Sequence, residues 1–384
     1  MKVAIIGGGP AGLYFARLMK RSRPDADIVV FEQNPREATY GFGVTLGGSA
    51  RERMRRIDED VHDRLAGVML FNNRQIIRLD DEEVLLEYAA SGGAIARLQL
   101  LNILQQASEE IGVVFKDGVR IVDLGQFAEF DLVVAADGVN SFVRSQFGAD
   151  FGTRQYFLNN HFAWYGVGRE MKPNALVFRH AHGGVFVAHY YAYAENMSTF
   201  VAECDGATWD RCGLAALDAR ERRTLIEDIF ANELDGAPLI DNKSDWRQFN
   251  VVSNERWVRG NIVLLGDAQR AAHFSIGSGT RLAMDDAAAL HQAFEEAGSD
   301  AVLALARFVD IRKPIRDQFA LAAERSFNWY EAMGDAMRAN VMDFTYDFLT
   351  RTGRVDDVRL KDYVPAFYRD YQRYRSREPE AVQQ

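Results

Sequence analysis

The chain has 384 residues, 48% of them apolar, which is enough to bury one large core and to form two domains. Its formal charge of −10 comes from acidic and basic residues mixed along the chain, and this excludes a nucleic-acid surface with clustered Lys and Arg. No apolar run approaches the roughly 18 residues of a membrane span, and Cys204 and Cys212 lack metal or redox spacing, as in a reducing cytoplasm.

The chain begins with a strand–helix–strand pattern. An apolar run, Lys2–Ile6, ends at a glycine-rich turn, and helical spacing of apolar residues follows over Ala11–Ser22. A second apolar run, Ile28–Phe31, completes the unit. We interpret the first run as a strand and not as a signal peptide, because the turn interrupts it and no cleavage pattern follows. The spacing predicts a βαβ unit of the length that binds a dinucleotide.

The glycine-rich turn has the pattern Gly7-x-Gly9-x-x-Gly12. Glycine permits the tight turn and lets phosphate oxygens approach the amides at the positive end of the helix. Glu32 follows about 20 residues after Gly12, where a carboxylate can hold ribose hydroxyls. The predicted cofactor-binding residues at this end are Gly7, Gly9, Pro10, Ala11, Gly12, Glu32 and Gln33.

The next segment contains short strands and one helix. The strands are predicted at Val68–Leu70, Gln75–Leu79 and Glu83–Tyr88, with turns at Asn72-Asn73 and Asp80-Asp81. A helix is predicted over Arg97–Ile111, ended by Gly112. Arg97 lies in its first turn, where a cation opposes the helix dipole. This placement favours an Arg97 side chain that faces a cofactor, and a surface arginine is the alternative.

A strand-rich region extends from His161 to Cys204. Its strands are predicted at Phe162–Val167, Ala175–Arg179, Val185–Tyr193 and Ser198–Glu203. Because aromatic side chains stack on an aromatic substrate, we select His161, Trp164, Tyr165 and Tyr191 as candidate substrate contacts. His189 is a candidate base for a phenol. Core packing is the alternative for each. His180 and His182 have metal-like spacing, but no other motif requires a metal, so no metal site is predicted.

Two more polar turns follow buried strands. Asp137-Gly138 follows Leu132–Ala136, and Gly266-Asp267 follows Ile262–Leu265. Such turns supply the amide donors and carboxylate acceptors that a nucleotide cofactor needs. A second glycine-rich turn, Gly277, Ser278, Gly279 and Thr280, opens a helical region that continues to the end of the chain. Its helix N-terminus would supply the positive potential that the N1–C2=O edge of a reduced flavin needs.

The order of these three turns resembles the single-component FAD-dependent aromatic hydroxylases with the p-hydroxybenzoate hydroxylase fold, over nearly the whole chain. His273–Thr280, Trp164–Gly166 and Met197–Phe200 are similar to one subgroup, which contains the anthraniloyl-CoA and salicylyl-CoA hydroxylases and the tryptophan hydroxylase of violacein biosynthesis. The resemblance implies that Asp137 and Gly138 serve both FAD and NAD(P)H and that Asp267 binds the ribityl chain.

The resemblance also implies the fold. We expect an α/β chain with a Rossmann-like FAD-binding domain (1–66, 90–155 and 250–330), an inserted antiparallel β-sheet substrate domain (67–89 and 156–249) and a helical C-terminal segment (331–384). Where most of these hydroxylases have a proline before the second glycine-rich turn, this chain has His273-Phe274-Ser275. His273 and Ser275 therefore join His189 as candidate catalytic residues, and a packed loop histidine is the alternative for His273.

The implied function is hydroxylation of an electron-rich aromatic substrate with NADH or NADPH and O₂, through a flavin C4a-hydroperoxide. The substrate classes left open are an aryl-CoA thioester, an indole or tryptophan-like compound, and a phenol. The alternative is a flavin-binding relative that shelters or oxidises an intermediate without hydroxylation. We expect a cytoplasmic monomer or homodimer without nucleic-acid or membrane partners. The basic cluster Arg51, Arg53, Arg55 and Arg56 could contact CoA phosphates, but a solvated amphipathic helix is the preferred interpretation.

Overall fold

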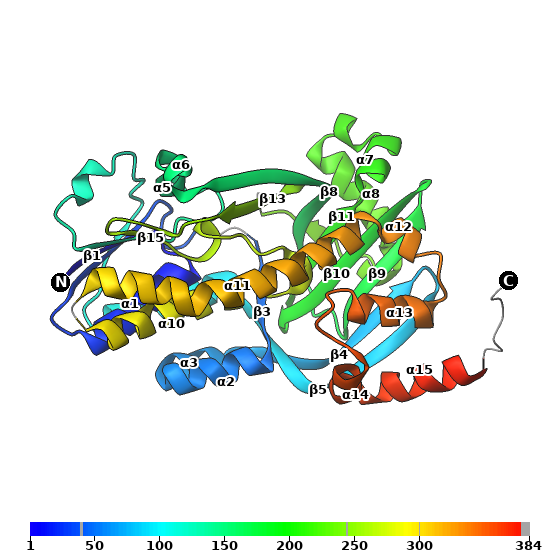
Figure 1. The fold of residues 1–384 in the computed structure, drawn as a ribbon. Coiled ribbons are helices and arrows are strands. Elements are labelled where there is room, and N and C mark those ends of the chain that lie inside the picture. Colours follow the sequence, from blue (N-terminus) through cyan, green and yellow to red (C-terminus); the bar gives the residue numbers. More distant parts are fainter. Residues whose placement is uncertain (39–40, 243–244, 299, 378–384) are drawn as a thin grey trace.

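The computed structural model describes residues 1–38, 41–242, 245–298 and 300–377. Two β-sheets form its framework, one of six strands and one of nine. Figure 1 shows the smaller sheet beside the N-terminus and the larger sheet at the opposite end, with the long helix α11 (Ala301–Glu331) extending between them. No helix of the described residues combines the length and apolarity needed to cross a bilayer.

The six-stranded sheet is parallel apart from its edge strand β14. Its spatial order is β14 (Val258–Arg259), β15 (Ile262–Leu264), β7 (Leu132–Ala135), β1 (Lys2–Ile6), β2 (Asp27–Glu32) and β6 (Val114–Asp117). In β1, Val3 and Ile5 face a helical layer of α1 (Pro10–Ser22), α4 (Arg97–Glu109) and α10 (Gly279–Ala297). Ala4 and Ile6 face the opposite core, to which α5 (Phe142–Gln146) and α6 (Gly148–Phe151) contribute. Burial on both faces explains the unbroken apolar runs of these strands.

The register of the small sheet determines where its strands end. Ile6 pairs with both Phe31 and Ala135, and Ala135 pairs with Leu264. The strands β2, β1, β7 and β15 therefore end in step, and the residues that follow each one emerge at the same edge of the sheet.

The nine-stranded sheet is mainly antiparallel, with one parallel pair between β4 and β9. Its order is β12 (Leu239–Ile240), β8 (Thr153–Val167), β11 (Met197–Cys204), β10 (Gly184–Ala194), β9 (Asn174–Ala181), β4 (Leu70–Leu79), β5 (Glu82–Ala96) and β3 (Gly43–Leu46), and β13 (Arg247–Asn254) also pairs with β8. The expected Rossmann-like domain with an antiparallel substrate sheet is confirmed. The domain boundaries stay a prediction, and β3 joins the larger sheet although it lies within 1–66.

The predicted turn at Asn72-Asn73 is wrong. β4 continues through it with a shift of register between Asn72 and Arg74. The side-chain amide of Asn72 bonds to both the N–H and the C=O of Arg74, and Asn73 donates to the carbonyl of Tyr88. These side chains satisfy the backbone groups that the bulge leaves unpaired, so the strand does not end there. The turn after Leu79 is confirmed, with Asp80 at φ 51°.

Helices cover both faces of the large sheet. On one face lie α7 (Gly206–Arg211), α8 (Ala219–Ile229) and α9 (Ala231–Leu234). On the other lie the end of α11 and the C-terminal helices α12 (Met333–Ala336), α13 (Val341–Thr350), α14 (Asp357–Tyr363) and α15 (Pro365–Arg377). Two helices, α2 (Gly48–Ile57) and α3 (Glu59–Ala66), connect β3 to β4 within the large sheet. The predicted helical C-terminal region is confirmed.

Candidate active site

The three polar turns meet at the carboxyl edge of the small sheet. A Cβ atom built on Gly7 would lie 2.3 Å from the carbonyl oxygen of Ala136, and φ of Gly7 is +109°. A Cβ atom on Gly266 would lie 3.0 Å from Cβ of Ala11. Only glycine permits these approaches, so the glycines bring together turns that are far apart in the sequence.

Glu32 fixes the glycine-rich turn from the neighbouring strand. Its Oε2 accepts a hydrogen bond of 2.7 Å from the N–H of Gly8, and its Oε1 accepts 2.8 Å and 2.7 Å bonds from Asn34. Gln33, the next residue, is exposed. Glu32 therefore contacts the glycine-rich turn, and Gln33 lies exposed next to it, while their contact with a cofactor stays a prediction.

The loop residues leave room for a ligand. A Cβ atom on Gly9, Gly138, Gly277 or Gly279 would have no atom of another residue within 4 Å, apart from immediate chain neighbours. α1 starts at Pro10, and both α1 and α10 lack a side-chain cap and an acidic residue in their first turn. The first N–H groups of these helices thus present uncompensated positive potential toward the open space.

Arg97 is placed among carboxylates from two different turns. It lies half-buried at the start of α4. Burial lowers the pKa of Arg97, while Asp267 and Glu32 act in the opposite direction. Burial raises the pKa of Asp267, and Arg316 and Arg97 oppose that shift. These shifts place Arg97 within electrostatic reach of carboxylates from two of the turns, and its contact with a cofactor stays a prediction.

One carboxylate oxygen of Asp137 accepts no hydrogen bond from the described residues. Its Oδ2 accepts a hydrogen bond of 3.1 Å from Val143 N–H, whereas its buried Oδ1 has no partner among the described residues. Burial raises the pKa of Asp137, opposed by a hydrogen bond from Ser141. Together with the open glycines and the two helix N-termini, this orphaned acceptor fits a hydroxyl-rich dinucleotide such as FAD.

A cavity of about 650 Å³ adjoins the second glycine-rich turn. One wall is formed by β4, β5, β9, β10 and β11, and the opposite wall by α11, α13 and the residues that connect α13 to α14. Ile276, Gly277 and Ser278 line the cavity, so the second turn is shared between the cavity and the cofactor crevice. Thr280 follows in the first turn of α10.

Successive side chains of a strand point to opposite faces of the sheet, so the predicted substrate residues lie on two different faces. His189 and Tyr191 line the cavity from β10, and the Tyr191 hydroxyl donates a 2.8 Å hydrogen bond to the Gly43 carbonyl. Trp164 of β8 has the same parity as Phe162 and packs against Gly41, outside the cavity lining. His161 and Tyr165 have the opposite parity.

That opposite face packs on α7 and α8. His161 stacks on Trp209 with ring centroids 4.0 Å apart, and the Tyr165 hydroxyl accepts a 3.0 Å bond from Trp246 Nε1. The structure therefore does not bring His161 or Tyr165 to the cavity, and core packing accounts for both.

His273 and Ser275 belong to a chain of hydrogen bonds. Arg351 Nε donates to Ser326 Oγ at 3.0 Å, the Ser326 and Ser275 hydroxyls are 2.8 Å apart, and Ser275 Oγ lies 2.8 Å from His273 Nδ1. Arg351 also donates to the Ser275 carbonyl at 2.7 Å. This chain fixes the backbone immediately before the second glycine-rich turn.

Neither candidate histidine carries a charge near neutral pH. Burial, aided by Arg351, lowers the pKa of His273 to about 3 and that of His189 to about 4. His273 packs against Phe249, Phe274 and Phe327 and faces a smaller cavity of about 190 Å³ on the other side of its turn. A direct role for His273 on a ligand in the larger cavity is not supported, whereas Ser275 lines that cavity.

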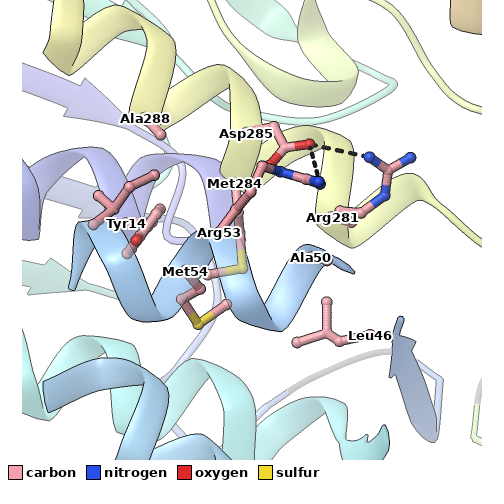
Figure 2. Close-up of a pocket in the computed structure, with 10 residues that line it drawn as sticks. Tyr14, Leu46, Ala50, Arg53, Met54, Arg281, Met284, Asp285 and Ala288 are labelled. Carbon is pink, nitrogen blue, oxygen red and sulfur yellow. Dashed lines mark hydrogen bonds and ion pairs between the residues drawn. The ribbon is translucent and has the colours of Figure 1, made fainter. Parts of the chain in front are cut away.

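The basic cluster on α2 is mostly paired. Figure 2 shows Arg53 and Arg281 directed at the same Asp285 carboxylate, with shortest distances of 3.2 Å and 3.1 Å. Arg55 and Arg56 pair with Glu59 and Glu52 at one-turn spacing. These contacts favour the solvated amphipathic helix over a phosphate site at Arg53, Arg55 and Arg56.

Several cavity residues were not predicted from the sequence. Arg74, Glu203, Tyr330, Arg351 and Arg354 all line the cavity. Glu203 carried a usable signal, because it interrupts an apolar strand at a position that shares a face with Val201. The other four had none. No group of three or more His, Cys, Asp or Glu within the described ranges could hold a metal ion, and Cys204 and Cys212 are free thiols.

Comparison with protein families gives two matches. Residues 85–319 match the family described as an FAD binding domain, and residues 5–78 match an NAD(P)-binding Rossmann-like domain. Both ranges include strands whose turns form the crevice described above.

Curated relatives align over nearly the whole chain. A salicyloyl-CoA 5-hydroxylase of Streptomyces sp is 38% identical over 372 residues, covering 92% of this chain and 70% of the relative. The 3-hydroxy-4-methyl-anthranilyl-[aryl-carrier protein] 5-monooxygenase of Streptosporangium sibiricum is 34% identical, with 92% and 95% covered. Protodeoxyviolaceinate monooxygenase of Chromobacterium violaceum is 31% identical, with 95% and 96% covered. Among solved structures, a tetrameric 2-methyl-3-hydroxypyridine-5-carboxylic acid oxygenase has the same fold, with a TM-score of 0.72 at 19% identity, covering 91% of this chain and 97% of that one.

Proposed function

This chain belongs to the FAD-binding-domain family of aromatic hydroxylases, and we propose that its substrate is an aromatic acyl group carried as a thioester on CoA or on a carrier protein. It is an FAD-dependent monooxygenase that uses NAD(P)H and O₂. Two relatives support the proposal through their names, which specify a CoA thioester and an aryl-carrier protein.

The observation that carries the proposal is the gradient of polarity along the cavity. Its buried end is lined by aromatic and aliphatic side chains such as Tyr330 and Val187, with the carboxyl group of Glu203 among them. Its exposed end carries Arg354, which has no ion-pair partner in the part of the chain that the structure describes, and Arg74, which pairs with Glu87 at 3.1 Å. An apolar end suits an aromatic ring, and arginines suit phosphate groups.

The residues of the crevice divide the work of holding FAD. The backbone amides of Gly9 and Ala11, at the start of the helix that begins with Pro10, would face the pyrophosphate. Glu32 would bind a ribose, and Asp267 would bind the ribityl chain. When bound, FAD accepts electrons from NAD(P)H and supplies the oxygen chemistry. The protein would orient the aromatic ring of the substrate, and the hydrogen bonds from Arg351 through Ser326 to Ser275 hold the turn that borders both the cavity and the cofactor crevice.

We retain Tyr191 as a substrate contact and the three-part domain division given above. In place of the catalytic roles predicted for His189 and Ser275, we propose that His189 forms part of the wall beside the substrate and that Ser275 positions the turn. We expect a monomer or a homodimer, which light scattering during size-exclusion chromatography measures. A relative that shelters an intermediate without hydroxylating it is the alternative.

The test is a comparison of thioesters with free acids. Purified holoenzyme should oxidise NAD(P)H faster with salicyloyl-CoA or anthraniloyl-CoA than with salicylate, anthranilate, tryptophan or indole. Stimulation by free tryptophan or indole alone would contradict the thioester proposal. Stimulation without a hydroxylated product would favour the sheltering alternative.

A further inference from the structure

Glu203 occupies the buried end of the cavity, next to the second glycine-rich turn. It lies on β11 opposite Val187 of β10 and Phe162 of β8, and it is 3% exposed. The Phe162 ring lies 4.6 Å from the ring of Phe274, which belongs to the turn over Phe274–Ile276. Glu203 is therefore on the side of the cavity where the reacting ring would meet the cofactor.

One oxygen of Glu203 is held and the other is free. Asn160 Nδ2 donates to Oε1 at 2.8 Å and also to the Tyr330 carbonyl at 3.0 Å, while the Asn160 N–H donates to Glu331 at 2.8 Å. Oε2 has no hydrogen-bond or ion-pair partner among the described residues, although Glu203 lines the cavity. The side chain is thus oriented by one oxygen and leaves the other for a ligand.

A buried carboxyl group without a cation is costly unless it remains protonated or bonds to a ligand. Burial raises the pKa of Glu203 to about 8, helped by Glu331 and opposed by the Asn160 hydrogen bond. An uncharged carboxyl group can both donate and accept a hydrogen bond. Val187, its partner on β10, and Val201, on the same face of β11, are apolar and line the cavity beside it.

We propose that Glu203 determines specificity by binding the hydroxyl or amino substituent of the aromatic ring through its free Oε2. This inference rests on the proposed function, because it requires a ring in the cavity. Hydroxyl and amino groups are the substituents that make a ring electron-rich, so recognition of such a group selects rings suited to hydroxylation.

Three thioesters separate this role from a structural one. Benzoyl-CoA, salicyloyl-CoA and anthraniloyl-CoA differ only in the ortho substituent, which is hydrogen, hydroxyl or amino. Calorimetric titration of the holoenzyme should give about tenfold tighter binding of the last two than of benzoyl-CoA, as expected for one hydrogen bond of ordinary strength. In Glu203→Met this preference should disappear through weaker binding of the substituted rings.

Glu203→Gln provides a sharper second variant. The Asn160 donor would orient the amide oxygen toward itself, so only the NH₂ group would face the ring. A hydroxyl group can accept from this NH₂ group, but an aromatic amine is a poor acceptor. Glu203→Gln should therefore keep the preference for salicyloyl-CoA and lose the preference for anthraniloyl-CoA.

Glu195→Gln is the matched control, because Glu195 is exposed in the turn between β10 and β11. It should retain both preferences. If the wild type hydroxylates a thioester and Glu203→Met keeps both preferences, the role of Glu203 is overturned while the proposed function stands. If the wild type binds none of the three thioesters, the CoA form of the proposed function fails, and with it the recognition of CoA-linked rings by Glu203.

Discussion

Gly7 and Gly9 belong to the same loop, but glycine is favoured at the two positions for different reasons. Gly7 has a positive φ and lies against the Ala136 backbone, so it is required by the fold itself. Gly9 has an ordinary φ of −79° and no neighbouring atom that a methyl group would meet. The protein itself therefore does not require glycine at this position, as the proposed contact with the pyrophosphate predicts.

This difference predicts opposite behaviour of two variants. Gly9→Ala should leave the stability of the apoprotein within about 0.5 kcal/mol of wild type and weaken FAD binding at least about tenfold. Gly7→Ala should lower the free energy of unfolding of the apoprotein by about 1–3 kcal/mol, because it combines strain with a clash. Urea denaturation of the apoproteins and fluorescence titration with FAD measure both effects. Wild-type FAD affinity in Gly9→Ala would contradict the placement of the pyrophosphate.

The raised pKa of Glu203 predicts that the free energy of unfolding depends on pH. Its pKa in the fold, about 8, lies above the ordinary value of 4.5, so the protonated form favours folding. This contribution is complete below pH 4.5 and is lost as the pH rises through about 8. Relative to Glu203→Gln, the wild type should lose about 1.4 kcal/mol of unfolding free energy per pH unit within this window.

Urea denaturation of both proteins across this range measures the difference between them. Nearby titrating groups, including Glu331, Tyr330 and His189, are present in both proteins and should largely cancel. Glu195→Gln, which lacks an exposed carboxylate, should run parallel to the wild type. A pH-independent difference between the wild type and Glu203→Gln would show that the Glu203 carboxyl is not shifted.

At the scale of elements, strand alternation decided which predicted residues reach the cavity. The strands of the large sheet were predictable from their β-branched and aromatic residues, but which face of β8 meets the cavity was not. Trp164 and Tyr165 are adjacent, and only the packing of α7 and α8 on one face fixes that Tyr165 points away from the cavity.

Other elements of the cavity come from long-range packing. Tyr330, Arg351 and Arg354 reach the cavity because the C-terminal helices fold back over the large sheet. Helical periodicity predicts those helices but not where they dock. In contrast, the positions of the three turns were predictable, because each turn follows an unbroken apolar run that predicts a buried strand.

A buried ion pair joins α10 to α11 beside the cofactor crevice. Asp286 is fully buried, and its Oδ1 accepts a 2.5 Å hydrogen bond from Arg312 while Arg316 lies 3.6 Å away. Asp286→Ala should lower the free energy of unfolding by about 3–5 kcal/mol, because it leaves buried guanidinium groups without their carboxylate. In Asp335→Ala, which breaks an exposed pair with Arg338, the change should stay within about 0.5 kcal/mol. Chemical denaturation distinguishes these outcomes. Equal losses of unfolding free energy in the two variants would contradict a stabilising role for the buried Asp286 ion pair.

The exposed end of the cavity predicts a charge effect on substrate binding. Arg354→Ala should raise KM for salicyloyl-CoA about two- to fivefold with little change in kcat, because an exposed charge interaction is modest. KM for the salicyloyl thioester of a short thiol without phosphates should not change. Arg338→Ala, on the exposed surface of the same C-terminal region, is the control. An equal rise in KM for both thioesters would place the CoA phosphates elsewhere.

At the scale of the whole molecule, the two sheets place the second glycine-rich turn between the cofactor crevice and the cavity. The small sheet positions the cofactor crevice at its carboxyl edge, and the large sheet with the C-terminal helices encloses the cavity. The residues Ile276–Ser278 border both. Hydroxylation requires this geometry, because the ring must meet the cofactor in a space that excludes water.

Isotope incorporation tests this central claim most directly. Purified holoenzyme with NAD(P)H, salicyloyl-CoA or anthraniloyl-CoA, and ¹⁸O₂ should yield a hydroxylated thioester that contains one ¹⁸O atom, with NAD(P)H consumption matched to product. Sustained oxidation of NAD(P)H with unlabelled, unhydroxylated thioester would contradict the account.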